Sequence, residues 1–318
     1  MDIMPTILKP EQVREKYGPM FCKSLITMVD EKSGRAQVIE TCSSTGPKEW
    51  DIVNRKRTVG IIRDIRDEGS IVMDLEIGEK PLNFGPASTE LGGQGIYSLR
   101  VEGDRVHTKW KGIAGASVGI GACLPQAEGV IETIYPDDFK IGGAFAAETE
   151  IVTPKMVRLV IGVDDTDTPQ QGASWVLTMQ LGRDCPYGKF LNHKIIQLNP
   201  KAPNKTTNCC STAVSFAATE EDVPKIIEFA KEFIRKGSYS DDTVMTTFVG
   251  LEVPEDLRKW SWDAKSVLFT IDDAVAVAER NGVEIHYVTG NKGTIGAVAA
   301  IGCFDLGLKA AGIPEDFE

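Results

Sequence analysis

Three aspartates lie within four positions in the middle of the chain. The residues from Val157 to Val163 are mostly aliphatic, and Asp164, Asp165 and Asp167 follow directly. A short β-branched run bounded by turn residues predicts a buried strand. Carboxylates this close repel one another unless a cation lies between them or some of them are protonated. A hard cation with oxygen ligands, such as Mg²⁺ shared with substrate phosphates, would relieve this repulsion.

The same residues also fit a solvated acidic turn in which Asp167 or Thr168 caps the next helix. Residue types alone favour neither the cation site nor such a turn. The position favours the cation site, because ligands of open α/β sheets bind at the carboxyl ends of the strands.

Two later segments carry residue types that suit a phosphate-bearing ligand. Asn199–Asn208 contains two prolines, which favour a rigid loop, and Lys201 and Lys205 lie there among hydroxyl and amide donors. Thr289–Gly296 is a glycine-rich turn that a ligand could approach closely, and Lys292 adds positive charge. Taken alone, each segment also fits an ordinary polar turn.

The bulk composition limits the class of protein. The chain has 318 residues, of which 42% are apolar and 25% are charged, and this predicts a globular protein with two domains. The formal net charge of -11 argues against a nucleic-acid partner, and we expect none. Seven cysteines without a CxxC pair and three widely separated histidines argue against a zinc site. We see neither a signal peptide nor an apolar run of membrane length, so we expect a cytoplasmic protein with reduced thiols.

The first half is rich in predicted hairpins. Strand pairs are expected at 21–29 with 36–41, at 58–66 with 70–77, and at 95–101 with 105–110. The glycine-rich stretch 111–128 contains neither a GKS or GKT motif nor GxGxxG, so we interpret it as close backbone packing or a bulged strand. Pro154 predicts a boundary between domains 1–154 and 155–318.

The second half alternates predicted strands with predicted helices, which argues for an α+β or α/β sandwich. Strands are expected at 157–163, 191–198, 244–253 and 283–288, and helices at 174–181, 221–236 and 271–281; a further apolar run lies at 210–218. The helix at 221–236 is the clearest, because its apolar side chains fall on one face.

Three segments of the second half together resemble the motifs of one family. IGVDDTDTP, QLNPKAPNKT and GNKGTIGAVAAIG are similar to GIDDTDSP, LNPNIPxKT and GxGLIGALAAIG of archaeal agmatidine synthase, in the same order. That enzyme modifies a cytidine of an isoleucine tRNA with ATP and agmatine. Three ordered motifs over about 140 residues are more specific than any one of them. The whole chain, with its hairpin-rich first half, most resembles methanogenesis marker protein 11 of methanogenic archaea.

The resemblance implies a kinase-like ATP and Mg²⁺ site with a ferredoxin-like portion beside it. The residues implied for catalysis and for metal binding are Asp164, Asp165 and Asp167. The residues implied for nucleotide binding are Lys205, Thr206, Gly290, Lys292, Gly293 and Gly296.

The chain departs from the synthase in two places. The synthase follows its DDTD with GMCTT, whose threonine accepts a phosphoryl group, whereas Trp175 lies in the matching stretch here. Ser174 and Thr178 are the nearby hydroxyl groups that could replace that threonine. The chain also shows no zinc ribbon before its end at Glu318, so we do not expect agmatine transfer to tRNA.

Two hypotheses follow. The first is an ATP- and Mg²⁺-dependent enzyme of the phosphotransferase or ligase type, which hydrolyses ATP or transfers a phosphoryl group to an unknown acceptor. In it, Asp164 and Asp167 hold the metal, and Asp165 holds a second ion or orients the acceptor. Lys205 and backbone groups near Gly293 neutralise phosphate charge. The alternative is a non-catalytic assembly or maturation factor for the methanogenesis machinery with a regulatory nucleotide site, which the missing threonine favours and the intact acidic cluster does not.

Overall fold

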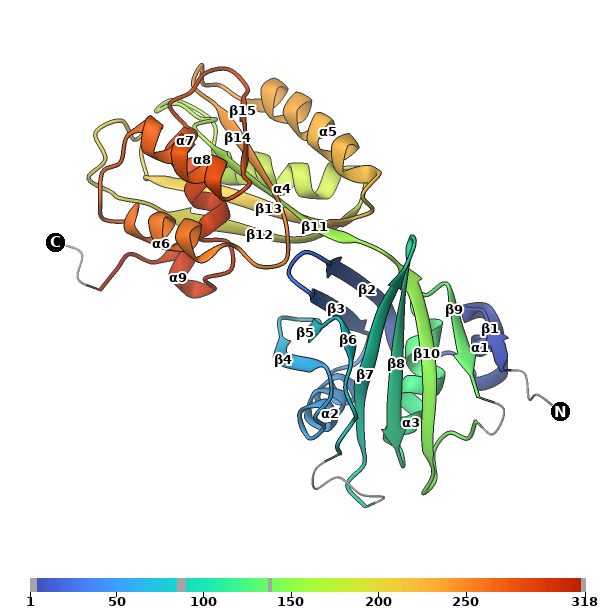
Figure 1. Cartoon of the computed structure of the whole chain (residues 1–318). Helices are drawn as coiled ribbons and strands as arrows, with labels where there is room; N and C mark the ends of the chain where they lie inside the picture. Colours follow the sequence, from blue (N-terminus) through green and yellow to red (C-terminus); the bar gives the residue numbers. More distant parts are fainter. Residues whose placement is uncertain (1–4, 85–89, 137–138, 316–318) are drawn as a thin grey trace. The chain divides into compact units, whose positions relative to one another are not determined.

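The chain forms two compact units, Met1–Met156 and Val157–Glu318, and each is described here by itself. The structure is a computed structural model that describes residues 5–84, 90–136 and 139–315 (Figure 1). These residues form three sheets in which every named strand pair is antiparallel. The mixed α+β class is therefore confirmed. The described strands do not form the parallel sheet that an α/β sandwich would contain.

Unit 1 contains two of the sheets. The six-stranded sheet has the order β1-β9-β10-β8-β7-β6, and the four-stranded sheet has the order β2-β3-β5-β4. Their strands are β1 (Thr6–Leu8), β2 (Cys22–Asp30), β3 (Arg35–Cys42), β4 (Ile62–Asp67), β5 (Ile71–Glu76), β6 (Gly78–Glu79), β7 (Gly93–Glu102), β8 (Arg105–Ile113), β9 (Glu132–Tyr135) and β10 (Ala146–Pro154). The three predicted strand pairs are all present, as β2 with β3, β4 with β5, and β7 with β8.

The helices of unit 1 were harder to predict. They are α1 (Pro10–Tyr17), α2 (Thr45–Lys56) and α3 (Ala116–Val118), and α3 continues into a π-helical turn, Gly119–Cys123, and a 3-10 turn, Leu124–Gln126. The stretch 111–128 is thus largely helical, and the bulged-strand interpretation is wrong. Its glycines do permit close packing, because a Cβ added at Gly121 would lie 2.3 Å from the Phe139 ring.

Unit 2 is a five-stranded sheet with helices on both faces (Figure 1). The strand order is β12-β13-β11-β14-β15. The strands are β11 (Val157–Asp164), β12 (Lys189–Gln197), β13 (Cys210–Ala218), β14 (Val244–Val249) and β15 (Glu284–Tyr287). The helices are α4 (Ser174–Asp184), α5 (Asp222–Gly237), α6 (Glu255–Asp263), α7 (Ile271–Arg280), α8 (Thr294–Gly302) and α9 (Leu308–Ala311).

Strand β11 lies at the centre of this sheet and alternates its side chains between two cores. Leu159, Ile161 and Val163 are fully buried in the core that includes α4 and α5. Val160 is buried in the other core, with α6, α7 and α8. The period of two is that of a strand, and burial on both faces explains why the run is almost wholly apolar. This burial fixes the end of β11, where the aspartates begin.

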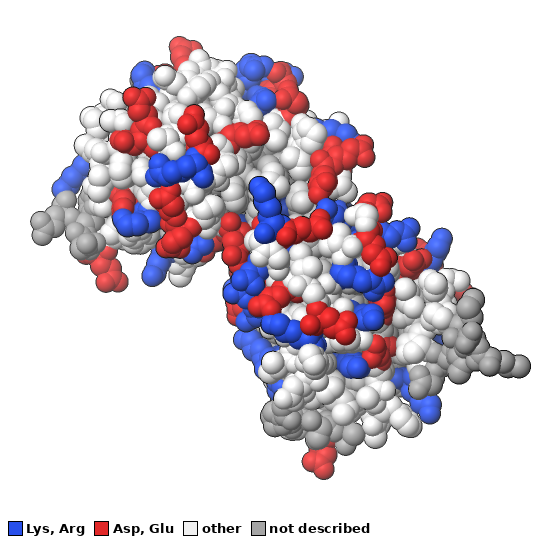
Figure 2. Space-filling view, viewed as in Figure 1, with Lys and Arg blue, Asp and Glu red and all other residues white. Residues whose placement is uncertain are grey.

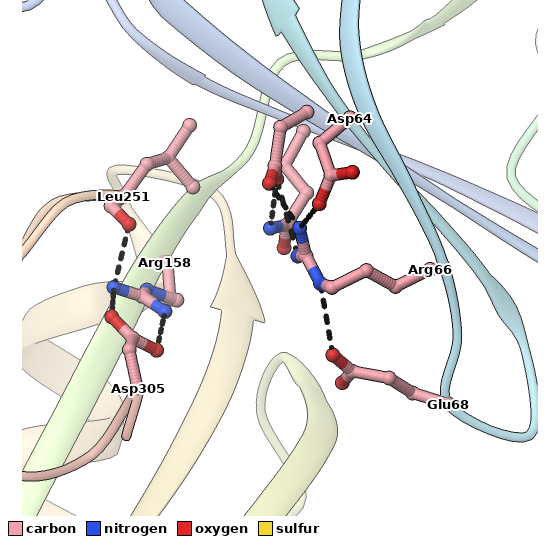
Figure 3. Close-up of polar contacts among 8 residues, drawn as sticks. Asp64, Arg66, Glu68, Arg158, Leu251 and Asp305 are labelled. Atoms are coloured by element: carbon pink, nitrogen blue, oxygen red, sulfur yellow. Dashed lines mark hydrogen bonds and ion pairs between the residues drawn. The ribbon is translucent and has the colours of Figure 1, made fainter. Parts of the chain in front are cut away.

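Arg158 anchors the start of the same strand (Figure 3). Its guanidinium donates to both carboxylate oxygens of Asp305, at 2.8 and 2.9 Å, and to the carbonyl of Leu251 at 2.7 Å. Paired donation of this kind is geometrically specific. Figure 3 also shows an ion-pair network of unit 1, in which Arg66 on β4 contacts Asp64 and Glu68. Among the described residues, no helix is long and apolar enough to cross a membrane.

Candidate functional site

The three aspartates lie on the turn that leaves the end of β11. Asp164 is the last strand residue, paired with Val244 of β14. Asp165 has a φ of 59°, in the left-handed region that aspartate tolerates better than most residues. Helix α4 then begins at Ser174, with Ala173 as its N-cap residue and no side-chain cap. The aspartates therefore do not cap this helix, as the alternative interpretation of the sequence required.

The Asp164 carboxylate packs against the first turn of α8. A Cβ built on Gly296 would lie 1.8 Å from Asp164 Oδ2 and 2.5 Å from its Cγ. A Cβ on Gly293 would lie 2.8 Å from the Asp164 carbonyl oxygen. Glycine is therefore required at both positions if the carboxylate is to stay in this place. The amino-terminal turn of a helix favours negative charge, which partly stabilises the carboxylate there.

The negative charge of Asp164 is nevertheless poorly compensated by neighbouring positive charge. Burial raises the pKa of Asp164 well above its usual range, and the nearby carboxylates of Asp165 and Asp167 raise it further, while the backbone N–H of Asp165 opposes them. Within the described part of the chain, no Lys or Arg side chain forms an ion pair with Asp164. A bound cation would supply the missing positive charge.

A second turn holds Asp165 in place. The Ser240 hydroxyl donates to Asp165 Oδ1 at 3.1 Å, and the Thr243 hydroxyl donates to the Asp165 carbonyl at 2.7 Å. Burial raises the pKa of Asp165, and Asp242 adds to this effect, whereas the Ser240 hydroxyl and the Lys292 ammonium oppose it. Lys292 itself forms an ion pair with Asp242. The glycine-rich turn thus brings its lysine to the acidic cluster.

Asp167 lies beside a serine at the start of α4. The Ser174 hydroxyl lies 3.5 Å from Asp167 Oδ1 and accepts a hydrogen bond from the Thr166 hydroxyl at 2.9 Å. Burial raises the pKa of Asp167, and the Ser174 hydroxyl lowers it in part. Thr178 lies one turn later, and its fully buried hydroxyl contacts His193 Nε2 at 2.9 Å and Thr212 Oγ1 at 2.8 Å. Of the two hydroxyl groups, only that of Ser174 touches an aspartate of the cluster.

The loop that contains Lys205 and Thr206 makes fewer contacts with the three aspartates than the glycine-rich turn does. The Lys205 ammonium is exposed and donates to the carbonyl of Pro200 in its own loop, and Thr206 is half-buried. Burial and the Asp164 carboxylate raise the pKa of the Cys209 thiol to about 11, and Lys205 opposes this. Lys205 and Asp164 therefore shift the pKa of one thiol in opposite directions, although the described structure shows no direct bond from Lys205 to the acidic turn.

Sequence reasoning missed the contribution of the turn at 238–243. Ser240, Thr243 and Asp242 hold the acidic turn, yet their sequence, SYSDDT, is typical of an ordinary polar connection. From the sequence alone, the acidic pairs Asp241-Asp242 and Asp272-Asp273 are both best interpreted as solvated helix caps. Asp273 does cap, in a reciprocal pair with Thr270 at the start of α7. No feature of the sequence separates the two acidic pairs, because only the fold places one of them beside β11.

Comparison with known proteins places the chain in a family. It is 36% identical over 301 residues to the uncharacterized protein MJ0921 of Methanocaldococcus jannaschii, and the match covers 93% of this chain and 98% of the relative. The chain belongs to the MJ0921 family. The family model described as the TiaS TCKD domain also matches residues 160–290, which include the acidic turn, the Lys205 loop and Gly290.

Other relatives of this MJ0921 family member match its second half. The tRNA 2-agmatinylcytidine synthetase TiaS of Thermococcus sibiricus is 36% identical over 154 residues, and that of Pyrococcus horikoshii is 32% identical over 149. Each match covers about 46% of this chain and 35% of the relative, so the chain spans about a third of their length. The resemblance of the second half to agmatidine synthase is thereby confirmed.

Solved structures give a weaker likeness. The crystal structure of TiaS in complex with tRNA and ATP has a TM-score of 0.42 and 24% identity, and it covers 46% of this chain and 36% of that chain. The complex of TiaS with tRNA, AMPCPP and agmatine has a TM-score of 0.39 over the same share of each chain. The relationship therefore depends on the sequence matches.

Our expectation that nucleic acid is not a partner is wrong, because the relatives that match the second half are tRNA-modifying enzymes by name. The net charge of -11 is a sum over the chain, whereas a nucleic acid contacts one local surface. Figure 2 shows acidic and basic side chains interspersed on the face drawn, not a continuous acidic surface. Net charge alone was too coarse an argument.

The three aspartates do not form a metal cage by themselves. Among residues 5–84, 90–136 and 139–315, no group of three or more His, Cys, Asp or Glu side chains is arranged to hold one metal ion. Mg²⁺ is commonly bound by one or two carboxylates, with water and substrate phosphates as its other ligands. Half-buried carboxylates that do not converge as a trio fit an ion of that kind.

Proposed function

We propose that this chain is an ATP- and Mg²⁺-dependent enzyme that acts on an RNA substrate, with its chemistry in unit 2. The observation that carries the proposal is the Asp164 carboxylate. It is half-buried, has no ion pair in the described structure and lies against the glycines of α8, inside the segment that matches the TiaS TCKD domain. The two ligand classes are supported by the sequence relatives, which are tRNA-modifying enzymes by name, and by the crystallisation of TiaS with tRNA and ATP.

Each acidic residue then has a role in the proposed site. Asp164 and Asp167 hold the metal, and Asp165, fixed by the hydroxyls of Ser240 and Thr243, holds a second ion or orients the acceptor. When bound, Mg²⁺ neutralises the phosphate charge that grows during transfer. The Asp164 carboxylate needs no reorganisation to receive it, because the packing of β11 and α8 already fixes its position.

The basic and glycine residues complete the proposed nucleotide site. The turn from Gly290 to Gly296 brings backbone N–H groups and the start of α8 towards the phosphates, where a helix amino terminus favours anions. Lys292 lies next to Asp242 and supplies positive charge at the same edge. Lys205 and Thr206 close on the phosphates from the neighbouring loop, which requires the Lys205 side chain to leave its contact with Pro200.

A finer assignment is also proposed. We propose that unit 2 has the kinase-like and ferredoxin-like organisation of agmatidine synthase, as residues 155–318, and that the role of residues 1–154 is specific to this family. The family would be that of methanogenesis marker protein 11, linked to the methanogenesis machinery. The support is the set of motifs in order, together with the match over nearly the whole chain to the Methanocaldococcus jannaschii protein.

Calorimetric titration of ATP, with and without Mg²⁺, tests the proposal on the full chain. We expect Mg²⁺-dependent binding by the wild type, loss of it in Asp164→Asn, and no change in Asp272→Asn. The last is the matched control, because Asp272 belongs to an exposed acidic pair on α7 outside the site. Transfer of label from α- or γ-labelled ATP to an archaeal tRNA pool then identifies the reaction. Equal ATP binding by Asp164→Asn and wild type would refute the assignment.

A further inference from the structure

Unit 1 contains a cavity that the proposed chemistry does not use. Its volume is about 510 Å³, within the range of small-ligand pockets. The lining is apolar or glycine except for the carboxylate of Asp51, and it includes Phe21, Trp50 and Val118. Helix α2 supplies the first wall and the α3 to π-helical segment supplies the other. The two walls approach closely, because a Cβ on Gly115 would lie 3.3 Å from the Trp50 ring.

The one charged lining residue is buried and incompletely paired. Asp51 is 2% exposed, and its Oδ2 has no hydrogen bond among the described residues. Arg55 Nη2 lies 3.6 Å from that oxygen, which is beyond hydrogen-bonding distance. The Gln94 amide donates to the other oxygen, Oδ1, at 2.5 Å. One acceptor of this carboxylate, in the wall of the cavity, therefore has no hydrogen bond among the described residues.

The charges behind Asp51 do not balance. Arg55 is completely buried, donates to Glu40 Oε2 at 2.5 Å and forms a longer ion pair with Asp51, so two carboxylates share one cation. Glu40 and Asp51 against Arg55 leave one formal negative charge in the interior. Burial raises the pKa of Asp51 to about 6, with Glu40 adding to the effect and Arg55 opposing it. Uncompensated charge of this kind is expensive to bury.

We propose that this cavity binds a small organic ammonium ion. The ammonium group lies on the Asp51 side of the cavity and supplies positive charge to the buried cluster. The apolar part of the ligand lies against Trp50 and Phe21, where an indole face also attracts a cation. The backbone of the second wall has two unusual features. Ala114, just before this wall, has a φ of 58°, and a π-helical turn follows at Gly119–Cys123. Both features occur often at functional sites.

Two matched probes test the charge requirement on the full chain. Benzylamine and benzyl alcohol share an aromatic ring, but only benzylamine carries a positive charge at neutral pH. We expect benzylamine to bind the wild type at least about tenfold more tightly than benzyl alcohol, as measured by ligand-observed NMR titration. The tenfold preference should vanish in Asp51→Asn and remain in Glu49→Gln, which removes an exposed carboxylate from the same helix.

A second variant tests the cavity without touching the charged cluster. A Cβ on Gly46 meets no atom within 4 Å, so Gly46→Leu should fold and fill the cavity. We expect this variant to lose at least about tenfold in benzylamine affinity. Unchanged benzylamine affinity in Gly46→Leu, equal affinity of the wild type for the two probes, or no saturation by benzylamine up to about 10 mM would each overturn the proposal.

Discussion

Replacing Gly296 by alanine should displace the Asp164 carboxylate while leaving its chemical nature intact. An alanine Cβ would lie 1.8 Å from Asp164 Oδ2, whereas ordinary contact begins at about 3.4 Å. The oxygen must therefore move by about 1.6 Å, or the start of α8 must shift away from β11. Both movements separate the carboxylate from the position that the strand end and the helix now fix.

The expected effects on binding and on stability differ in size. A displacement of about 1 Å in a reacting group can lower activity by about a hundredfold, so we expect at least that loss in Mg²⁺-dependent ATP turnover. Alanine within a helix is favoured over glycine by about 1 kcal/mol, and overpacking costs about 1–3 kcal/mol. The net loss in the free energy of unfolding should therefore be only about 0–2 kcal/mol. The fold should survive a change that largely removes function.

The assay combines ATP titration with urea unfolding. Gly312→Ala is the control for a glycine-to-alanine change in the same unit, because its Cβ would meet only carbonyl oxygens at 3.8 and 3.9 Å. Adding Asp164→Ala to Gly296→Ala should recover stability, since the clash is gone, without recovering ATP binding. Binding by Gly296→Ala within about twofold of the wild type would show that the position of Asp164 does not matter to the nucleotide, and would refute the reasoning.

Three further predictions use other groups of unit 2. The pKa of Asp164 is raised in the fold, so its contribution to stability is full below the unfolded value of about 4 and is lost as pH rises through the folded value. Urea unfolding without nucleotide should accordingly show Asp164→Asn gaining stability over the wild type as pH increases from 4 to 8. If a hydroxyl of α4 accepts phosphate, Ser174→Ala should abolish labelling by γ-labelled ATP and Thr178→Ala should not, because the Thr178 hydroxyl is enclosed by His193 and Thr212. Lys265→Met should lower the free energy of unfolding by about 3 kcal/mol and increase hydrogen exchange near the end of the chain, because the buried ammonium donates to the carbonyls of Gln197, Ala310 and Gly312.

Each of these predictions has an outcome that would contradict it. Parallel pH profiles for wild type and Asp164→Asn would mean that the carboxylate is not destabilising when charged. Loss of labelling in Thr178→Ala alone would transfer the acceptor role to the buried threonine. The control for Lys265→Met is Lys259→Met on the exposed face of α6, which should change stability by less than about 0.5 kcal/mol.

The sequence predicted the elements whose burial follows a simple period. Helix α5 was predicted within a residue at each end, because its apolar side chains recur with the period of a helix. The apolar run that became β13, Cys210–Ala218, was found at its observed bounds but was not assigned as a strand. Helix α2 was missed, since its buried face carries Asp51, Asn54 and Arg55 and so lacks an apolar stripe. Helix α8 was missed for the opposite reason, as it is apolar all round and shows no period.

The candidate site divides in the same way. The acidic turn and the glycine-rich turn are visible in sequence because unusual residue types lie close together there. The hydroxyls of Ser240 and Thr243 are not, because they meet Asp165 only through the pairing of β11 with β14 and the turn that precedes β14. A residue that acts by holding another residue has no signature of its own in a single sequence.

Each unit contains a carboxylate whose charge its neighbours compensate incompletely: the half-buried Asp164 in unit 2 and the buried Asp51 in unit 1. Asp164 has no ion pair within the described chain, and Asp51 has one oxygen without a hydrogen bond there. Such groups lower stability, and an apolar residue of similar size would avoid that loss. Structural support does not explain them, because neither carboxylate bridges two elements through a complete hydrogen-bond network. The two cations that we propose, a metal with nucleotide in unit 2 and an organic ammonium in unit 1, would account for both carboxylates. On this argument, a saturating concentration of either ligand should raise the unfolding temperature of the wild type. Without ligand, Asp164→Asn and Asp51→Asn should each unfold at a higher temperature than the wild type. Each variant should lose the increase caused by the ligand of its own site and keep the increase caused by the other ligand.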